Sequence, residues 1–164
     1  TTNLLNDKNH LGFIHQALEN SDRRIQTNQN LNPAFLLAVL LWPPLLEDLK
    51  QSGLDLFHPQ ADMVAIESIM AAMLMNQSKI MAIPRRASDF VLDIWKLQPR
   101  FEHYQDPSAS QVIHHRKFRA GHDFFMLRDA YHQWPHDMIA YWANQRKQHK
   151  NLPQKKRPRS DQKP

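Results

Sequence analysis

The chain has 164 residues, 41% hydrophobic and 23% charged, with a net charge of +5, and is long enough to bury one domain's core. It has no cysteine and three isolated glycines, which excludes disulfide frameworks, Cys-based zinc sites and glycine-rich phosphate loops. Its longest apolar run, 34–42, is too short to span a membrane. The N-terminus has no signal-peptide pattern and no initiator Met, so we expect a cytoplasmic protein and a fragment of a longer chain.

Apolar residues at helical spacing predict a series of helices and no strands. In chain order, the expected helices span residues 7–20, 34–42, 45–51, 59–76, 85–97, 110–115, 118–133 and 135–147. A polar stretch, 21–32, is expected to separate the first two helices. The side chains expected to face the core are Leu11, Ile14, Leu18, Met63, Ile66, Ile69, Met70, Met73, Leu74, Phe90, Val91, Ile94, Trp95, Phe118, Phe124, Phe125, Leu127 and Tyr131.

Prolines and capping residues set the expected boundaries. Asp7 is a plausible N-cap, and Asn32 followed by Pro33 is a stronger helix-start signal. Pro43-Pro44 is expected to stop or kink the apolar helix, and Pro99 to close or kink a later one. The fold class is therefore all-α, an irregular body of roughly six to eight helices over 1–147, followed by a disordered basic tail over 148–164.

The charge is concentrated at the C-terminal end. Residues 146–164 hold eight lysines and arginines and one acid, whereas the other 145 residues carry 13 basic and 15 acidic groups. A near-neutral body with a basic tail suits a polyanion such as nucleic acid, because flexible cations bind phosphates without reading sequence. A solubilising tail, or a contact for an acidic protein, is the alternative.

Two internal segments also combine cations in an informative way. Arg85 and Arg86 open a helix after Pro84, where cations oppose the helix dipole unless an acid or phosphate lies nearby. Ion pairing with Asp89 or with a neighbouring helix is the simpler explanation. Residues 114–128 interleave cations with aromatic residues, as RNA-binding segments do. Helical geometry assigns the aromatic residues to the core and leaves Lys117, Arg119 and Arg128 for solvent or phosphate, with Arg119 and Asp123 spaced as an i,i+4 pair.

Catalytic and metal signals are weak. The ten histidines have poor spacing for a shared site, and no HExxH is present. There is no D-x-D pair for two-metal nucleotidyl transfer, and no glycine elbow flanks a serine. We therefore expect no metal site, no cofactor in this segment and no autonomous enzyme activity.

Several segments, taken together and in this order, resemble the C-terminal part of bacterial poly(A) polymerases, which belong to the class II nucleotidyltransferase superfamily with the CCA-adding enzymes. The segments are 32–36 (NPAFL), 41–47 (LWPPLLE), 82–86 (AIPRR), 93–98 (DIWKLQ) and 117–128 (KFRAGHDFFMLR). Pro99 departs from the pattern, in which the helix continues. The resemblance implies a late neck, a helical body and a basic tail that hold RNA, without the catalytic head that uses Mg²⁺ and ATP.

The resemblance therefore implies an RNA-binding segment of a polynucleotide adenylyltransferase, which would hold the RNA 3′ end while the absent head adds AMP, in mRNA polyadenylation and RNA turnover. The residues expected to contact RNA are Arg85, Arg86, Lys117, Arg119, Arg128, Arg146, Lys147, Lys155, Lys156, Arg157 and Arg159. Two alternatives stay open. One is a helical module that docks RNA-degradation proteins, and the other is the body of a CCA-adding relative.

Overall fold

The computed structural model describes residues 8–27 and 32–153. Within these ranges the chain forms six α-helices and one 3-10 helix, with no strand, which confirms the all-α prediction. The helices are α1 (Lys8–Gln26), α2 (Pro33–Gln51), α3 (Met63–Ser78), α4 (Arg85–Glu102), η2 (Ala109–His114), α5 (Phe118–His132) and α6 (His136–Lys150).

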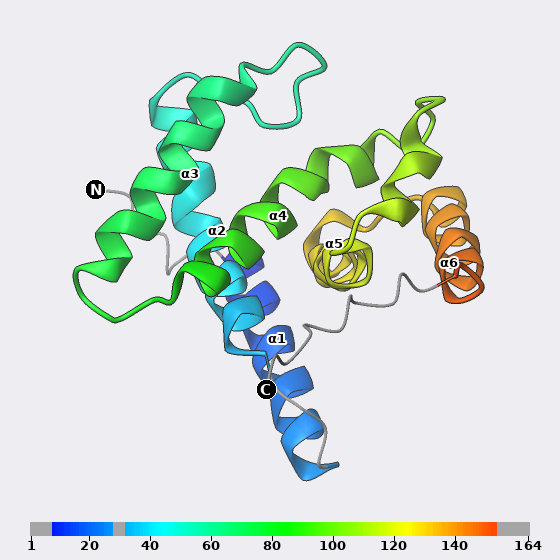
Figure 1. The fold of residues 1–164 in the computed structure, drawn as a ribbon, viewed down its shortest axis with the longest axis horizontal. Coiled ribbons are helices and arrows are strands. Elements are labelled where there is room, and N and C mark those ends of the chain that lie inside the picture. Colours follow the sequence, from blue (N-terminus) through cyan, green and yellow to red (C-terminus); the bar gives the residue numbers. More distant parts are fainter. Residues whose placement is uncertain (1–7, 28–31, 154–164) are drawn as a thin grey trace, which may run out of the picture.

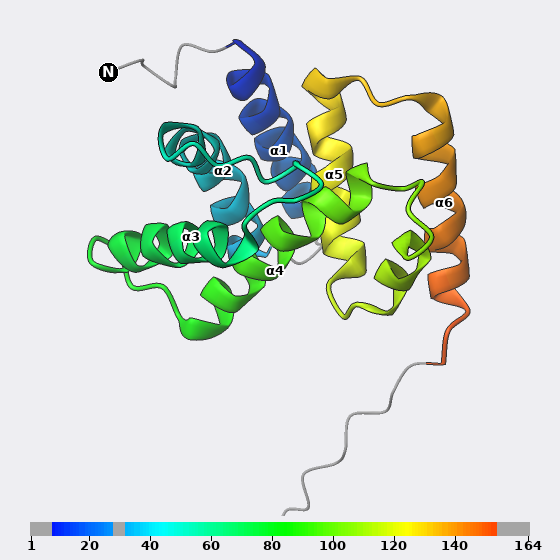
Figure 2. The ribbon, with the colours of Figure 1, turned by 90° about the horizontal axis from the view of Figure 1, so that it is seen from above.

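The helices form two groups that share α4 and α5 (Figures 1 and 2). The larger core cluster joins α1, α2, α3 and the first half of α4 to Phe124 and Leu127 of α5. The second cluster joins the end of α4 to η2, α6 and the other side of α5, centred on Phe101 and Trp142. Figure 2 shows α5 lying between α1 and α6, so α5 contributes apolar side chains to both clusters.

The backbones of α4 and α5 approach closely at Gly121. A Cβ at this position would lie 2.9 Å from Leu97 Cδ1 and 3.1 Å from Phe101 Cε2, so the space that a side chain would take is filled by α4. The buried Gln98 side chain joins the two helices there, because its Nε2 donates to the carbonyl oxygens of Ile94 and Gly121 at 3.0 and 3.2 Å. This junction holds the two helices in a fixed relation.

The first helix differs from its prediction in length and in orientation. It continues to Gln26 through most of the stretch predicted to be a polar connection. Its inward face carries Phe13 and Ala17, whereas Leu11 and Leu18 are 46% and 48% exposed. Phe13 sets this orientation because its ring packs edge-on against Phe124 of α5, with centroids 5.5 Å apart. The expected N-cap Asp7 and the side chain of Tyr131 lie outside what the structure describes.

Pro43 and Pro44 do not end a helix, so the prediction of a stop or kink there is wrong about the stop. The stretches 34–42 and 45–51 form the single helix α2, which includes both prolines. A proline inside a helix removes a hydrogen bond, at a cost of ~3 kcal/mol. The turns beyond the prolines bury Leu45 and Leu49 almost completely, and burial of each such side chain contributes about 1.5–3 kcal/mol. Tertiary packing therefore offsets the local cost.

Pro99 behaves in the same way, since α4 runs past it to Glu102. Pro99 is itself buried, and the continuation places Phe101 in the second core cluster with no exposed surface. Trp142 Nε1 donates to the carbonyl oxygen of Phe101 at 2.9 Å and ties this last turn to α6. The prediction of a helix end or kink at Pro99 is thus wrong about the end.

Other boundary signals are confirmed. The side chain of Asn32 accepts a hydrogen bond from the amide of Ala34 at 3.0 Å and caps α2, with Pro33 as its first residue. Pro84 precedes α4 as expected, and Phe90, Val91, Ile94 and Trp95 are all buried. The helix predicted at 59–76 begins later, at Met63, after an Asp62 cap.

Among the described helices, none combines the length and apolar character that crossing a membrane requires.

Candidate nucleic-acid interface

One face of α4 carries a row of charged side chains opposite its buried face. Arg86, Asp89, Asp93, Lys96 and Arg100 follow one another at intervals of three or four residues, so they share one side of the helix. Arg85 borders the same row. Arg85, Arg86 and Arg100 are exposed, and Lys96 is half-buried. The row therefore presents four cations and two acids to solvent.

The turn between η2 and α5 adds two cations to the edge of this row. Arg116 Nη2 lies 3.4 Å from Asp93 Oδ2, and Lys117 Nζ lies 4.8 Å from the ring centroid of Phe90. We call the six cations Arg85, Arg86, Lys96, Arg100, Arg116 and Lys117 the α4 basic face. Because Asp93 is already paired with Arg116, most of the positive charge on this face is uncompensated.

His115 lies within the field of the same cations. Burial lowers the pKa of His115, and the charges of Arg100, Arg116 and Lys96 lower it further, against the opposing effect of Asp93. Its Nδ1 accepts a hydrogen bond from the backbone amide of Lys117 at 3.0 Å. The imidazole is therefore neutral at pH 7, and it holds the backbone that carries Lys117 in place.

Arg119 is exposed and lies beside α6 rather than in the charged row of α4. After burial, Arg119 is the largest contributor to the lowered pKa of His149 on α6, followed by Arg146. The i,i+4 pair predicted between Arg119 and Asp123 does not form. The carboxylate of Asp123 accepts instead from Arg146 Nη1 at 2.6 Å, which leaves Arg119 beside α6 and available to solvent.

Arg128 is the clearest error among the predicted RNA contacts, because its side chain has no exposed surface. Its Nη2 pairs with Glu102 Oε2 at 2.7 Å, and its Nη1 donates to Gln98 Oε1 at 3.1 Å. The guanidinium carbon also lies 4.8–5.2 Å from three aromatic ring centroids. These rings are those of Trp42, Phe57 and Trp134. Arg128 is therefore a structural residue between the two core clusters.

Arg146 is also engaged within the protein. It belongs to α6, and besides Asp123 its Nη1 lies 2.8 Å from Nδ1 of His122. Burial and the charge of Arg146 lower the pKa of His122 to about 4, with Asp123 opposing, so this imidazole is neutral. Since α6 continues to Lys150, the ordered body runs past Lys147, the predicted limit. Lys147 is exposed, and the predicted contacts Lys155, Lys156, Arg157 and Arg159 lie outside the described residues.

The structure thus brings Arg85, Arg86 and Lys117 together and adds three cations that the sequence prediction missed. The missed residues are Lys96, Arg100 and Arg116. The signal was present in α4, because the polar positions 86, 89, 93, 96 and 100 repeat at helical spacing. The contact of Arg116 with Asp93 joins residues 23 positions apart and follows from the tertiary fold alone.

Comparison with known proteins connects this arrangement to a family. The profile of the family described as "Polymerase A arginine-rich C-terminus" matches residues 58–164, which include α3 to α6 and all of the α4 basic face. The chain belongs to this family.

Three curated relatives that this chain matches share the name "Poly(A) polymerase I". "Poly(A) polymerase I" of Escherichia coli O6:H1 is 38% identical over 120 residues, 71% of this chain and 24% of that protein. The proteins of the same name from Salmonella typhi and Haemophilus influenzae are 37% and 32% identical, and the matches cover 71% of this chain in both cases. The match therefore spans about a quarter of the length of each relative.

Proposed function

We propose that this chain is the part of a poly(A) polymerase that holds RNA while a catalytic head adds AMP from ATP to the 3′ end, in RNA polyadenylation and turnover. The observation that carries the proposal is the α4 basic face, in which six cations from α4 and the η2–α5 turn share one surface. Membership of the polymerase A family supports it. Mg²⁺ and ATP would act in the head, and this chain would contribute RNA affinity.

The α4 basic face suits a phosphate backbone in extent and in chemistry. From Arg86 to Arg100 the helix rises about 21 Å at 1.5 Å per residue, so several consecutive phosphates can lie along it. Arginine binds a phosphate through two parallel N–H groups, whereas lysine acts as a mobile point charge. Phosphate contacts release counterions and do not read sequence. Binding would therefore be strongly salt-dependent and tolerant of sequence.

The cations of this face differ in how firmly they are held. Arg116 is anchored by Asp93, and Lys117 lies over Phe90, whereas Arg85, Arg86 and Arg100 make no ion pair within the described part of the chain. These three arginines and Lys96, which also makes no ion pair within the described residues, would form the main phosphate contacts. The anchored pair would fix the edge of the track at the η2–α5 turn.

A pair of matched double variants tests the proposal. K96Q/R100Q removes two charges from the α4 basic face, and K50Q/K79Q removes two elsewhere, one on α2 and one at the residue that follows α3. Binding of a labelled 20-nucleotide oligo(A) is followed by fluorescence anisotropy. The proposal predicts weaker binding for K96Q/R100Q than for K50Q/K79Q at the same net charge. Equal affinities of the two variants would contradict it.

One observation favours a second function, docking of a protein partner. Val64 and Met75 lie on one exposed face of α3, and Ile80 and Met81 follow it; these side chains are 80%, 65%, 79% and 52% exposed. Large exposed apolar patches mark protein contacts, and these side chains belong to one helix and the residues directly after it. Pull-down with the RNA-degradation proteins of the same cell, with wild type and V64S/M75S, tests this function. Capture that high salt preserves and V64S/M75S abolishes would support it.

A further inference from the structure

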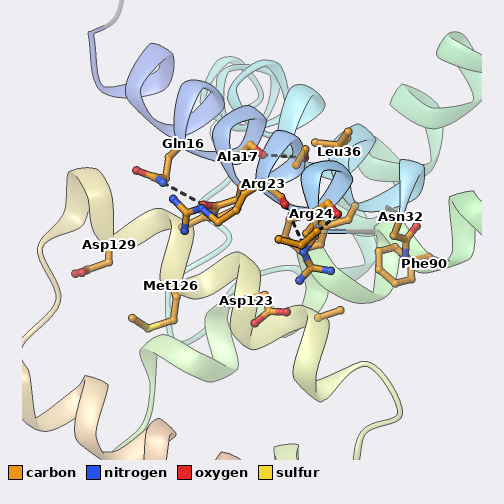
Figure 3. Close-up of a pocket in the computed structure, with 16 residues that line it drawn as sticks. Gln16, Ala17, Arg23, Arg24, Asn32, Leu36, Phe90, Asp123, Met126 and Asp129 are labelled. Atoms are coloured by element: carbon orange, nitrogen blue, oxygen red, sulfur yellow. Dashed lines mark hydrogen bonds between the residues drawn. The ribbon is translucent and has the colours of Figure 1, made fainter. Parts of the chain in front are cut away.

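A groove of about 700 Å³ lies between α1 and α5, beside the start of α2 and α4 (Figure 3). Its volume is in the range of small-molecule sites, ~300–1,000 Å³. Part of its lining is apolar, with Phe35 from α2, Phe90 from α4 and Met126 from α5. Arg23 and Arg24 from α1 face Asp123 and Asp129 of α5 across the opening (Figure 3).

The two arginines of this groove carry more charge than the acids opposite them compensate. Asp123 is already paired with Arg146 at 2.6 Å. Asp129 accepts from the backbone amide of Trp134 at 2.7 Å and keeps its negative charge, so it offsets one of the two arginines. Within the described part of the chain, neither Arg23 nor Arg24 makes an ion pair. An anion that enters the groove therefore meets two guanidinium groups with unused donors.

The groove also adjoins the α4 basic face. The ring of Phe90 lines the groove, and Lys117 Nζ of the α4 basic face lies 4.8 Å from the centroid of that same ring. Ala120, one helical turn after Lys117, lines the groove as well. A strand whose phosphates follow the α4 basic face can therefore reach the groove at Phe90 without leaving the protein surface.

We propose that the α1–α5 groove binds one nucleotide, with its phosphate at Arg23 and Arg24 and its base against the apolar lining formed by Phe35, Phe90 and Met126. An apolar slot beside cations suits a nucleotide, because the base has an apolar face and the phosphate a charge. The nucleotide can be a residue of bound RNA or a free mononucleotide. The inference rests on the proposed function only where the nucleotide is a residue of bound RNA.

Methionine methyl groups give a local readout. Met126 lines the groove, whereas Met75 is 65% exposed on α3, so the ¹³C-methyl NMR signal of Met75 is the internal control. The probes are a 20-nucleotide oligo(A) and AMP, each added to the full chain. We expect the Met126 signal to shift with oligo(A) and the Met75 signal to stay in place. A shift with AMP as well identifies a site open to free nucleotides, and a shift with oligo(A) alone identifies an RNA residue.

Variants separate this inference from the proposed function. R23Q/R24Q is expected to abolish the Met126 shift and to reduce the log–log salt slope of oligo(A) binding by about 1.4, at ~0.7 per lost contact; K50Q/K79Q is expected to keep both. If Met126 does not move while K96Q/R100Q still weakens oligo(A) binding, the groove inference is wrong and the RNA function stands. If the chain binds no oligo(A), the RNA function is wrong, and the AMP titration alone decides for or against the groove.

Discussion

Replacing Arg128 with Met tests whether this residue is structural or binds RNA. The substitution keeps an apolar stem but removes the ion pair with Glu102 and the hydrogen bond to Gln98. Removal of one partner of a buried ion pair costs about 3–5 kcal/mol, because the other charge stays behind. The side chain of Glu102 is 19% exposed and keeps part of its hydration, so we expect the lower end, ~3 kcal/mol. For a chain of this size that lowers Tm by about 6–12 °C.

Urea denaturation followed by circular dichroism measures this loss, and the double variant R128M/E102Q is its control. Because the double variant also removes the stranded charge, it should be more stable than R128M alone. Folded R128M should bind oligo(A) as wild type does, since Arg128 has no exposed surface. A loss of stability below about 1 kcal/mol, or a loss of oligo(A) binding by folded R128M, would refute the structural role.

Three further predictions concern single residues. Burial lowers the pKa of His122 from 6.5 to about 4. The stability that the neutral imidazole contributes is therefore present above pH 6.5 and is lost as the pH falls through 4, by roughly 3 kcal/mol. H122Q should flatten this part of the profile of unfolding free energy against pH. N32A should lower the unfolding free energy by about 1 kcal/mol through loss of the α2 cap, whereas N32D should preserve it. R146Q should destabilise the chain in urea melts because Asp123 loses its partner. It should change the affinity for oligo(A) less than K96Q/R100Q does. A larger loss of affinity for R146Q than for K96Q/R100Q would make Arg146 an RNA contact.

The helices were predictable from the sequence because most signals were local. Asn32-Pro33 and Ile83-Pro84 are start signals that act through neighbouring backbone groups, and both hold in the structure. The prolines at 43, 44 and 99 misled the prediction, since their local cost is offset by core contacts of residues beyond them. The orientation of α1 failed for a similar reason, because the contact of Phe13 with Phe124 spans most of the chain.

The functional surface was only partly predictable. A cation at a helical position is expected to face solvent unless a partner is known, and the partners of Arg128 and Arg146 lie 26 and 23 residues away in the sequence. Arginines held by such distant partners cannot be recognised from spacing alone. The α4 basic face, by contrast, was visible as a periodic pattern, and it requires the fold only to place Arg116 and Lys117 beside it.

The measurement that tests the account most directly is the salt dependence of oligo(A) binding by a chain that ends at Pro153. The structure places this end after α6, so the truncation removes only residues 154–164 and leaves the contacts of Arg146 intact. Loss of the five cations in 154–164 should lower the log–log slope by up to about 3.5, at ~0.7 per contact. The account predicts weaker but still salt-dependent binding that K96Q/R100Q reduces further. No detectable binding at low salt would place RNA affinity in the tail alone and contradict the role of the α4 basic face.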